Sequence, residues 1–137
     1  MKPFIHAKSS AKKYGGKWED YFPIHDFMDC SKGAFSDNRH RTLTHNAWFI
    51  KFVLERVHFI NSGPMTPDGS FPTIINSDGT HVSVREIGEQ HILEDFRYKF
   101  IPDASDYLEH MEMKNWMNAI PGKCIPSSAV KLQVRKE

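Results

Sequence analysis

The chain has 137 residues, of which 39% are hydrophobic and 26% are charged, so we expect a single globular domain that can bury its own core. Eighteen basic residues nearly cancel seventeen acidic ones, and the net charge of +1 gives no general reason to expect nucleic acid or an anionic membrane as a partner. No apolar run approaches the roughly 18 residues of a membrane helix, and the N-terminus lacks the apolar core of a signal peptide. Cys30 and Cys124 have no metal-type spacing and are expected to be free thiols. We therefore expect a cytoplasmic protein.

The first half of the chain predicts two helices after an irregular start. Residues 1–20 are rich in Lys, Ser and Gly and show neither helical nor strand period, so we expect an N-terminal arm. A first helix is predicted from Tyr21, with Pro23 in its opening turn and Gly33 weakening its end. A second helix is predicted from a cap at Ser36 or Asp37 to about Phe59.

The second half predicts a hairpin and two further helices. Residues 61–71 carry turn signals, and the turn sequence at 76–79 predicts a hairpin of strands 73–75 and 81–83. Ser83 and Glu86 have the spacing of a capping box, which begins a third helix that runs to about Tyr98. A fourth helix is expected from Ala104 to about Asn118, followed by a tail over 123–137. The fold class is thus mainly α, a compact bundle of about four helices with one small β-hairpin.

Charged and histidine residues are unusually dense between residues 25 and 45. His25, Asp29 and Lys32 are spaced to share one stripe of the first helix. His45 lies among the apolar residues of the second helix, which predicts that it points into the interior or into a cleft. Because charge seldom lies beside core-forming residues in a soluble helix, the pattern indicates an internal polar site.

Two pairs with a spacing of four residues suggest metal binding. They are His25 with Asp29 and His91 with Asp95, and His45 can supply a third imidazole. Imidazole and carboxylate suit zinc, manganese or iron, with open positions for a water that the metal would acidify. Our candidate metal ligands are His25, His45, His91 and Asp95. Our candidate catalytic residues are His25, Asp29, His45 and His91.

Basic residues near this cluster could bind an anion. Lys32, Arg39, Arg41 and Arg85 could hold a phosphate or carboxylate, or they could form salt bridges with nearby acidic residues. Each histidine taken alone could equally be a hydrogen-bonded core residue. A Cys30 nucleophile is a further alternative, although nothing positions an oxyanion hole.

The His25-Asp26 dipeptide is similar to the metal-binding motif of the His-Asp phosphohydrolases, which are helical enzymes. The spacing of the remaining ligands does not map onto that family.

Several longer blocks resemble an uncharacterised family of small bacteriophage and bacterial proteins over residues 4–118. The blocks are IHAKSSAKKYGGKWEDY, PIHDFMD-SK, D-RHR-L-HN, INSDGTHVSVREIGEQHILEDF and the Ile101-Pro102 loop before Trp116-Met117. The resemblance implies no reaction, but its blocks contain many of the polar residues named above, and on that basis His40, Glu89 and Gln90 join Lys32, Arg39 and Arg41 as candidate ligand-binding residues. The blocks also contain His6. The chain departs from the family at Asn46, at Trp48-Phe49 and in a longer excursion at 63–72, each of which could narrow or cover a site.

The sequence predicts a small phage-type accessory protein, a metal-assisted hydrolase acting on a phosphate-containing small molecule. If the protein is phage-encoded, it would act in the host cytoplasm. The alternative is a non-enzymatic protein that binds a host factor or a nucleotide, with the same residues forming a buried polar network. A third reading, nucleic-acid binding through Lys8, Lys12, Lys13 and Lys17, is not favoured.

Overall fold

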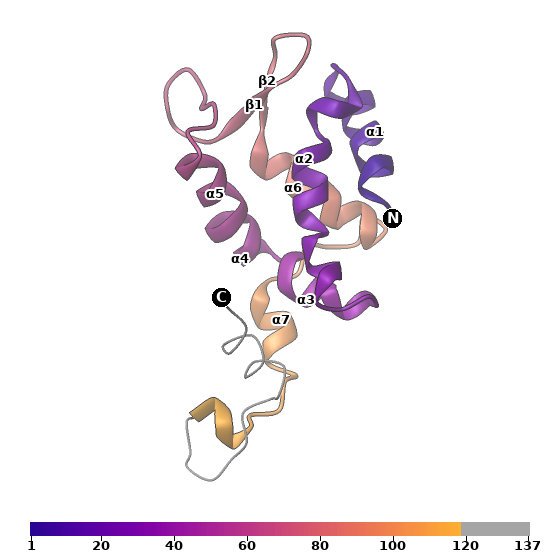
Figure 1. The fold of residues 1–137 in the computed structure, drawn as a ribbon, viewed down its shortest axis with the longest axis vertical. Helices are drawn as coiled ribbons and strands as arrows, with labels where there is room; N and C mark the ends of the chain where they lie inside the picture. Colours follow the sequence, from indigo (N-terminus) through magenta and orange to yellow (C-terminus); the bar gives the residue numbers. More distant parts are fainter. Residues whose placement is uncertain (119–137) are drawn as a thin grey trace, which may run out of the picture.

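A computed structural model describes residues 1–118, and the predicted tail at 123–137 lies outside them. The fold is mainly α-helical with one small hairpin, as predicted. Helices α1 (Pro3–Tyr14), α2 (Phe22–Met28) and α6 (Val84–Asp95) pack against one another. Figure 1 shows these three helices on one side, α4 and α5 on the other, and the hairpin at one end. Among the described residues, no helix is long and apolar enough to cross a membrane.

The predicted N-terminal arm is wrong, because residues 3–14 form helix α1. The helix buries His6, Ala7 and Ser10, whereas Phe4 and Ile5 are exposed. A helix that turns polar side chains inward has no ordinary amphipathic period, which is why the pattern was not visible in the sequence. The short 3-10 helix η1 (Trp18–Asp20) then leads into α2.

The first predicted helix is present but shorter than expected. Helix α2 ends at Met28, and the chain continues as the 3-10 helix η2 (Cys30–Gly33). Because the turn tightens after Asp29, Lys32 lies at the end of a second short helix and reaches back to Asp29.

The second predicted helix is wrong as a continuous element. It is divided into η3 (Asn38–His40), α3 (Arg41–Thr44), α4 (Ala47–Phe49), the π-helical η4 (Ile50–Leu54) and α5 (Glu55–Ile60). The break falls at His45 and Asn46, where Asn46 has extended backbone and its side chain accepts a hydrogen bond from Phe49 N at 2.7 Å. Asn46 therefore begins a new helix, which leaves His45 in a connection that can turn inward.

The hairpin and the third helix agree with the prediction. Strands β1 (Thr73–Ile75) and β2 (His81–Ser83) pair antiparallel, with Ile74 opposite Val82. Ser83 caps α6 by accepting a hydrogen bond from Glu86 N. Helix α6 ends at Asp95 rather than near Tyr98, because Arg97 and Tyr98 adopt positive φ angles that end the helix.

The fourth predicted helix is much shorter than expected. Helix α7 (Ala104–Leu108) has five residues, and the 3-10 helix η5 (Asn115–Asn118) follows after a gap. Leu108, Met111 and Trp116 are exposed, so little buried surface holds this segment in a longer helix.

The hydrophobic core lies where α2, α6, η4 and β2 meet. Gly88 of α6 faces η4, and a Cβ atom there would lie 2.7 Å from Leu54 Cδ2. This close approach packs α6 tightly against η4, while Gln90 and Glu94 of the same helix contact α1. The fully or nearly buried core members are Ala7, Tyr21, Ile24, Met28, Phe49, Ile50, Leu54, Val82, Val84, Ile87 and Ile92.

Candidate metal centre

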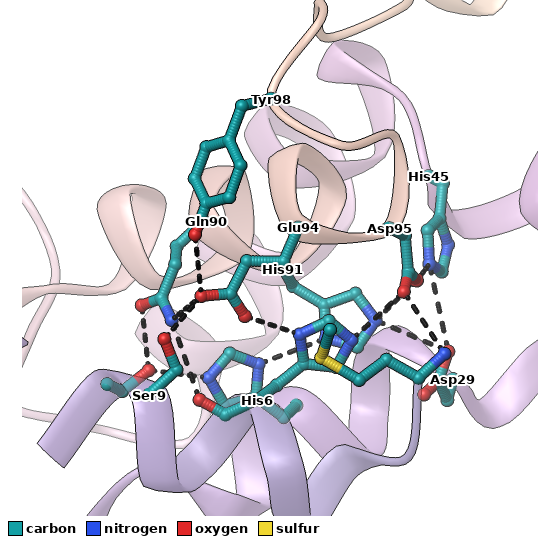
Figure 2. A network of polar contacts seen from close by, with 12 residues as sticks. His6, Ser9, Asp29, His45, Gln90, His91, Glu94, Asp95 and Tyr98 are labelled. Carbon is teal, nitrogen blue, oxygen red and sulfur yellow. Dashed lines mark hydrogen bonds and ion pairs between the residues drawn. The ribbon is translucent and has the colours of Figure 1, made fainter. Parts of the chain in front are cut away.

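A buried group of histidines and carboxylates lies between α1, α2, α6 and the 40–46 connection; we call it the His/carboxylate cluster. Figure 2 shows how the side chains of α6 lie between those of α1 and His45. The members are His6, His25, Asp29, His40, His45, His91, Glu94 and Asp95. Their side chains come from these four segments of the chain, so the cluster exists only in the folded protein.

Four residues of the cluster can offer one ligand atom each to a single metal ion: Asp29, His45, His91 and Asp95. Their candidate ligand atoms all lie within 4.8 Å of one another. His91 Nε2 is 3.3 Å from Asp29 Oδ1 and 3.4 Å from Asp95 Oδ2. His45 Nε2 is 2.7 Å from Asp95 Oδ2 and 3.7 Å from Asp29 Oδ1. We call these four residues the metal group.

His6, His25 and His91 form a second group whose candidate ligand atoms lie within 4.8 Å of one another, so His91 belongs to both groups. The rings of His6 and His91 have centroids 3.9 Å apart, and those of His25 and His91 are stacked at 5.2 Å. His6 Nδ1 is 2.7 Å from Glu94 Oε1, and its Nε2 is 3.1 Å from Asp95 Oδ1. His6 therefore joins two carboxylates, and the Met1 ammonium lies 3.4 Å from the same Asp95 oxygen.

A chain of hydrogen bonds runs from Glu94 to His91. Gln90 Nε2 donates to Glu94 Oε2 at 2.9 Å, and Ser10 Oγ donates to Gln90 Oε1 at 2.7 Å. Ser10 Oγ is also 2.7 Å from His25 Nε2, and His25 Nδ1 is 3.0 Å from His91 Nδ1. We call this series, from Glu94 through Gln90, Ser10 and His25, the outer chain. Ser9 and Tyr98 donate to Glu94 as well, so the start of the outer chain is an acceptor carboxylate.

His45 has a shorter chain of its own. Its Nδ1 is 2.9 Å from Thr44 Oγ1, which is 3.0 Å from Ser31 Oγ. Ser31 Oγ donates to the carbonyl oxygen of His40 at 2.9 Å. Both ring nitrogens of His45 are thus in contact with polar atoms, although the side chain is fully buried.

His40 lies beside the metal group. Its Nδ1 is 2.7 Å from the carbonyl oxygen of Asp37, and its Nε2 is 3.6 Å from Asp29 Oδ1. The Nε2 atom is buried and has no hydrogen-bond partner among the described residues, and the same is true of Asp29 Oδ2.

The electrostatics favour neutral imidazoles beside ionised carboxylates. Burial is the largest influence on His91 and lowers its pKa to about 4, and burial also lowers the pKa of His45 despite the contact with Asp95. Burial, followed by repulsion from His91, lowers the pKa of His25 to about 3. Burial alone would raise the pKa of Asp29, but the contact with His91 outweighs it and lowers the value to about 2. The pKa of Asp95 also lies below its usual range, because the contacts with His45 and His6 outweigh burial.

His6 differs from His25, His45 and His91. Burial alone would lower its pKa, but the hydrogen bonds with Asp95 and Glu94 outweigh burial and raise it. The Glu94 pKa falls to about 2, since bonds with His6, Ser9 and Gln90 outweigh the effect of burial.

The structure brings the four predicted catalytic residues and the four predicted metal ligands together. His25, Asp29, His45, His91 and Asp95 all belong to the cluster. His25 is not adjacent to the carboxylates of the metal group, since its ring nitrogens meet Ser10 and His91 instead.

The predicted ligand-binding residues only partly reach the cluster. Lys32 Nζ is 3.4 Å from Asp29 Oδ2, and Gln90 belongs to the outer chain. The Arg39 side chain is 72% exposed and paired with Asp37, while the Arg41 guanidinium lies over the Phe96 ring. Those two arginines therefore do not form a clamp on the cluster, and the half-buried Glu89 lies on another face of α6, beside Arg85 and Ile50.

Sequence reasoning left Ser9, Ser10, Glu94 and Tyr98 out of the site, and it named His6 without giving it a role. His6, Ser9 and Ser10 are spaced by three and four residues, which places them on one face of α1. That spacing was the available signal, but it has meaning only once residues 3–14 are known to be helical.

Comparison with known proteins places the chain in a family without giving it an activity. The chain belongs to the family described as a domain of unknown function, DUF6915, whose pattern matches residues 1–117. No curated protein and no solved structure matches the chain. The expectation that the chain belongs to an uncharacterised family is thereby confirmed.

Proposed function

We propose that the protein binds one divalent transition metal between Asp29, His45, His91 and Asp95. Two ligands that each lie about 2.1 Å from a metal are roughly 3.0–3.4 Å apart when their angle at the metal is near 90–110°. The two distances from His91 Nε2 to the carboxylate oxygens, 3.3 and 3.4 Å, correspond to this spacing. Imidazole nitrogen with carboxylate oxygen is a donor set for zinc, manganese or iron.

The hydrogen atoms around His45 carry this proposal. A carbonyl oxygen can only accept a hydrogen bond, so the Ser31 hydroxyl donates its single hydrogen to His40 O. Ser31 Oγ must therefore accept from the Thr44 hydroxyl. Thr44 Oγ1 then accepts from His45 Nδ1, which holds the single proton of a neutral ring. The unprotonated His45 Nε2 therefore points at the ionised oxygen of Asp95, 2.7 Å away. Two electron pairs at that distance repel each other unless one cation binds both atoms.

The same argument applies to His91 through the outer chain. Because Glu94 is ionised, Gln90 must turn its amide nitrogen toward it, and Gln90 Oε1 then accepts from Ser10. Ser10 accepts from His25 Nε2, His25 Nδ1 accepts from His91 Nδ1, and His91 Nε2 is left unprotonated. That atom faces Asp29 and Asp95. Metal-bound histidines characteristically donate their other N–H to such outer partners.

We further propose that the bound metal supports hydrolysis of a phosphate-containing small molecule, which would make the protein an accessory enzyme. A divalent metal with nitrogen and oxygen ligands lowers the pKa of coordinated water and polarises a phosphoryl oxygen. Lys32 supports this reading, since its half-exposed ammonium contacts Asp29 and provides a positive charge between the cluster and solvent. Arg39 and Arg41 have no part in it, because their guanidinium groups are engaged elsewhere.

A second candidate function is a non-enzymatic binding protein whose cluster only holds the fold together. The four side chains of the metal group are each at most 4% exposed. This burial favours the second candidate, because a substrate would need access to the cluster from solvent. In that case His45 or His91 would carry an additional proton and form ordinary ion pairs with the carboxylates.

Metal analysis separates the proposed metal site from a metal-free network. Protein purified without an affinity tag is analysed for zinc, manganese and iron, together with His45→Gln, Asp95→Asn and the control Glu89→Gln. Glu89 lies on the same helix as His91 but on another face. We expect about one metal ion per chain in the wild type and the control, and a loss in both ligand variants. A metal-free wild type that also fails to bind added zinc, manganese or iron would contradict the proposal.

Hydrolysis is tested on the metal-loaded protein with a phosphomonoester and a phosphodiester of p-nitrophenol. We expect turnover that requires the metal and disappears in Asp95→Asn but not in Glu89→Gln. Full metal binding without turnover of either ester would reject these substrate classes and favour the non-enzymatic function.

A further inference from the structure

The His40 side chain has a feature that the four-ligand site does not use. Its Nε2 atom is buried without a hydrogen-bond partner among residues 1–118, and the side chain is only 4% exposed. A buried polar atom without a partner is costly, so it normally has a ligand or a bonded neighbour. Asp29 Oδ1 lies 3.6 Å away from it.

The His40 ring carries its proton on Nδ1, the nitrogen that contacts Asp37, and not on Nε2, the nitrogen nearer to Asp29. Nδ1 lies 2.7 Å from the carbonyl oxygen of Asp37, which can only accept, so Nδ1 holds the proton of a neutral ring. The unprotonated Nε2 is therefore directed toward Asp29, as the Nε2 atoms of His45 and His91 are. Three imidazoles thus turn the same atom toward one carboxylate oxygen, at 3.3, 3.6 and 3.7 Å.

The position of His40 follows from the local fold. The 3-10 helix η3 begins at Asp37, whose side chain accepts a hydrogen bond from Arg39 N. The His40 carbonyl accepts from Ser31, which ties η3 to η2 and hence to Asp29 at the end of α2. His40 and His45 rings then meet edge to face with centroids 5.3 Å apart. The backbone thereby holds His40 beside Asp29, next to the four residues whose ligand atoms all lie within 4.8 Å of one another but not itself one of them.

We propose, on the basis of the metal site proposed above, that His40 is a fifth protein ligand and that the site selects a six-coordinate metal, iron(II) or manganese(II), over four-coordinate zinc. Structural zinc sites are almost always tetrahedral and use four ligands. Three imidazoles and two carboxylates exceed that number and suit an octahedral ion, with one position left for water or substrate. The two carboxylates balance the charge of the divalent ion.

Cobalt(II) chloride is a suitable probe, because four-coordinate cobalt absorbs visible light strongly and five- or six-coordinate cobalt absorbs it weakly. Chelator-stripped wild type, His40→Ala and the control His81→Ala are titrated, His81 being exposed on the hairpin. We expect weak visible bands in the wild type and the control. We expect His40→Ala to bind cobalt roughly 10- to 100-fold less tightly.

A second measurement does not depend on a variant that could fail to fold. The wild type, labelled with ¹⁵N in its histidines, is loaded with ¹¹³Cd(II) chloride, and the histidine Nε2 atoms that show scalar coupling to cadmium are identified. We expect three of them, from His40, His45 and His91. This inference would be overturned if cadmium couples to His45 and His91 alone, the wild type shows strong four-coordinate cobalt bands, and His40→Ala binds cobalt as tightly as the wild type. That outcome would leave the four-ligand site intact. Failure of the wild type to bind either ion would overturn both.

Discussion

His25 and His91 face each other through the same ring atom, with His25 Nδ1 lying 3.0 Å from His91 Nδ1. Two nitrogens at that distance share one hydrogen, so the protonation of one ring determines that of the other. The proton on His25 is fixed in turn by Ser10, Gln90 and Glu94. Residues that contact no proposed ligand position therefore determine which nitrogen of His91 is free to bind a metal.

Removing the Ser10 hydroxyl should weaken metal binding although Ser10 is not a ligand. In Ser10→Ala the His25 ring loses the partner that holds its proton on Nε2, so His91 can adopt the other tautomer. We expect metal affinity to fall about 10- to 100-fold, measured by competition with a chromophoric chelator. Ser9→Ala is the matched control, because Ser9 contacts Glu94 but lies outside the chain from Gln90 to His91. Equal affinities in the two variants would contradict this role for the outer chain.

Chelation should lower the melting temperature of the metal-loaded protein. A ligand present at a hundredfold excess over its dissociation constant stabilises the native state by about 2.7 kcal/mol, which corresponds to roughly 10 °C for a domain of this size. Calorimetry before and after treatment with EDTA measures the shift. His45→Gln should lose this dependence, so a variant that still melts lower after chelation would place the metal elsewhere.

Substitution of Asn46 should destabilise the segment that positions His45. Its Oδ1 accepts from Phe49 N at 2.7 Å, and its Nδ2 donates to the carbonyl oxygen of Thr42 at 3.0 Å. Loss of an N-cap costs about 1 kcal/mol, and Asn46→Ala should lose somewhat more because a second bond is removed. Urea unfolding of metal-free protein measures the difference. Asn38→Ala, at an exposed residue of η3, should change stability far less, and a similar loss in both would argue against the capping role.

Asp20 should make stability fall in acid. Its carboxylate accepts from Lys17 N and from the backbone and hydroxyl of Ser77, and these bonds, that from Lys17 first, lower its pKa below the usual value. Because the folded state holds this proton less tightly than the unfolded chain does, the stabilisation is complete above the unfolded pKa. It is lost as pH falls through the folded pKa.

The Asp20 effect is measured as the slope of unfolding free energy against pH below neutrality. Asp20→Asn should flatten that slope and lower stability at neutral pH, whereas Glu19→Gln, at the exposed neighbouring residue, should do neither. An unchanged slope in Asp20→Asn would show that the bonds to Lys17 and Ser77 contribute nothing to the pH dependence.

Local chemistry in the sequence was enough to predict several elements. The turn residues at 76–79 specified the hairpin, and Ser83 specified the start of α6, since both signals act within a few residues. The position of His45 among apolar residues predicted its burial, and the side chain is fully buried. The i, i+4 spacing of His91 and Asp95 placed both on one face of a helix that does form.

Only the tertiary structure determined how these residues meet. Helix α1 was not visible because it turns His6 and Ser10 inward, and a polar face is buried only when carboxylates and imidazoles from other helices satisfy it. The break at His45 and Asn46 was hidden by apolar residues that would suit a continuous helix, and it is the inward turn at this break that directs His45 toward Asp95. The sequence by itself determined which residues carry imidazole and carboxylate groups. Their convergence depends on contacts between residues 66 positions apart, and no local propensity encodes such contacts.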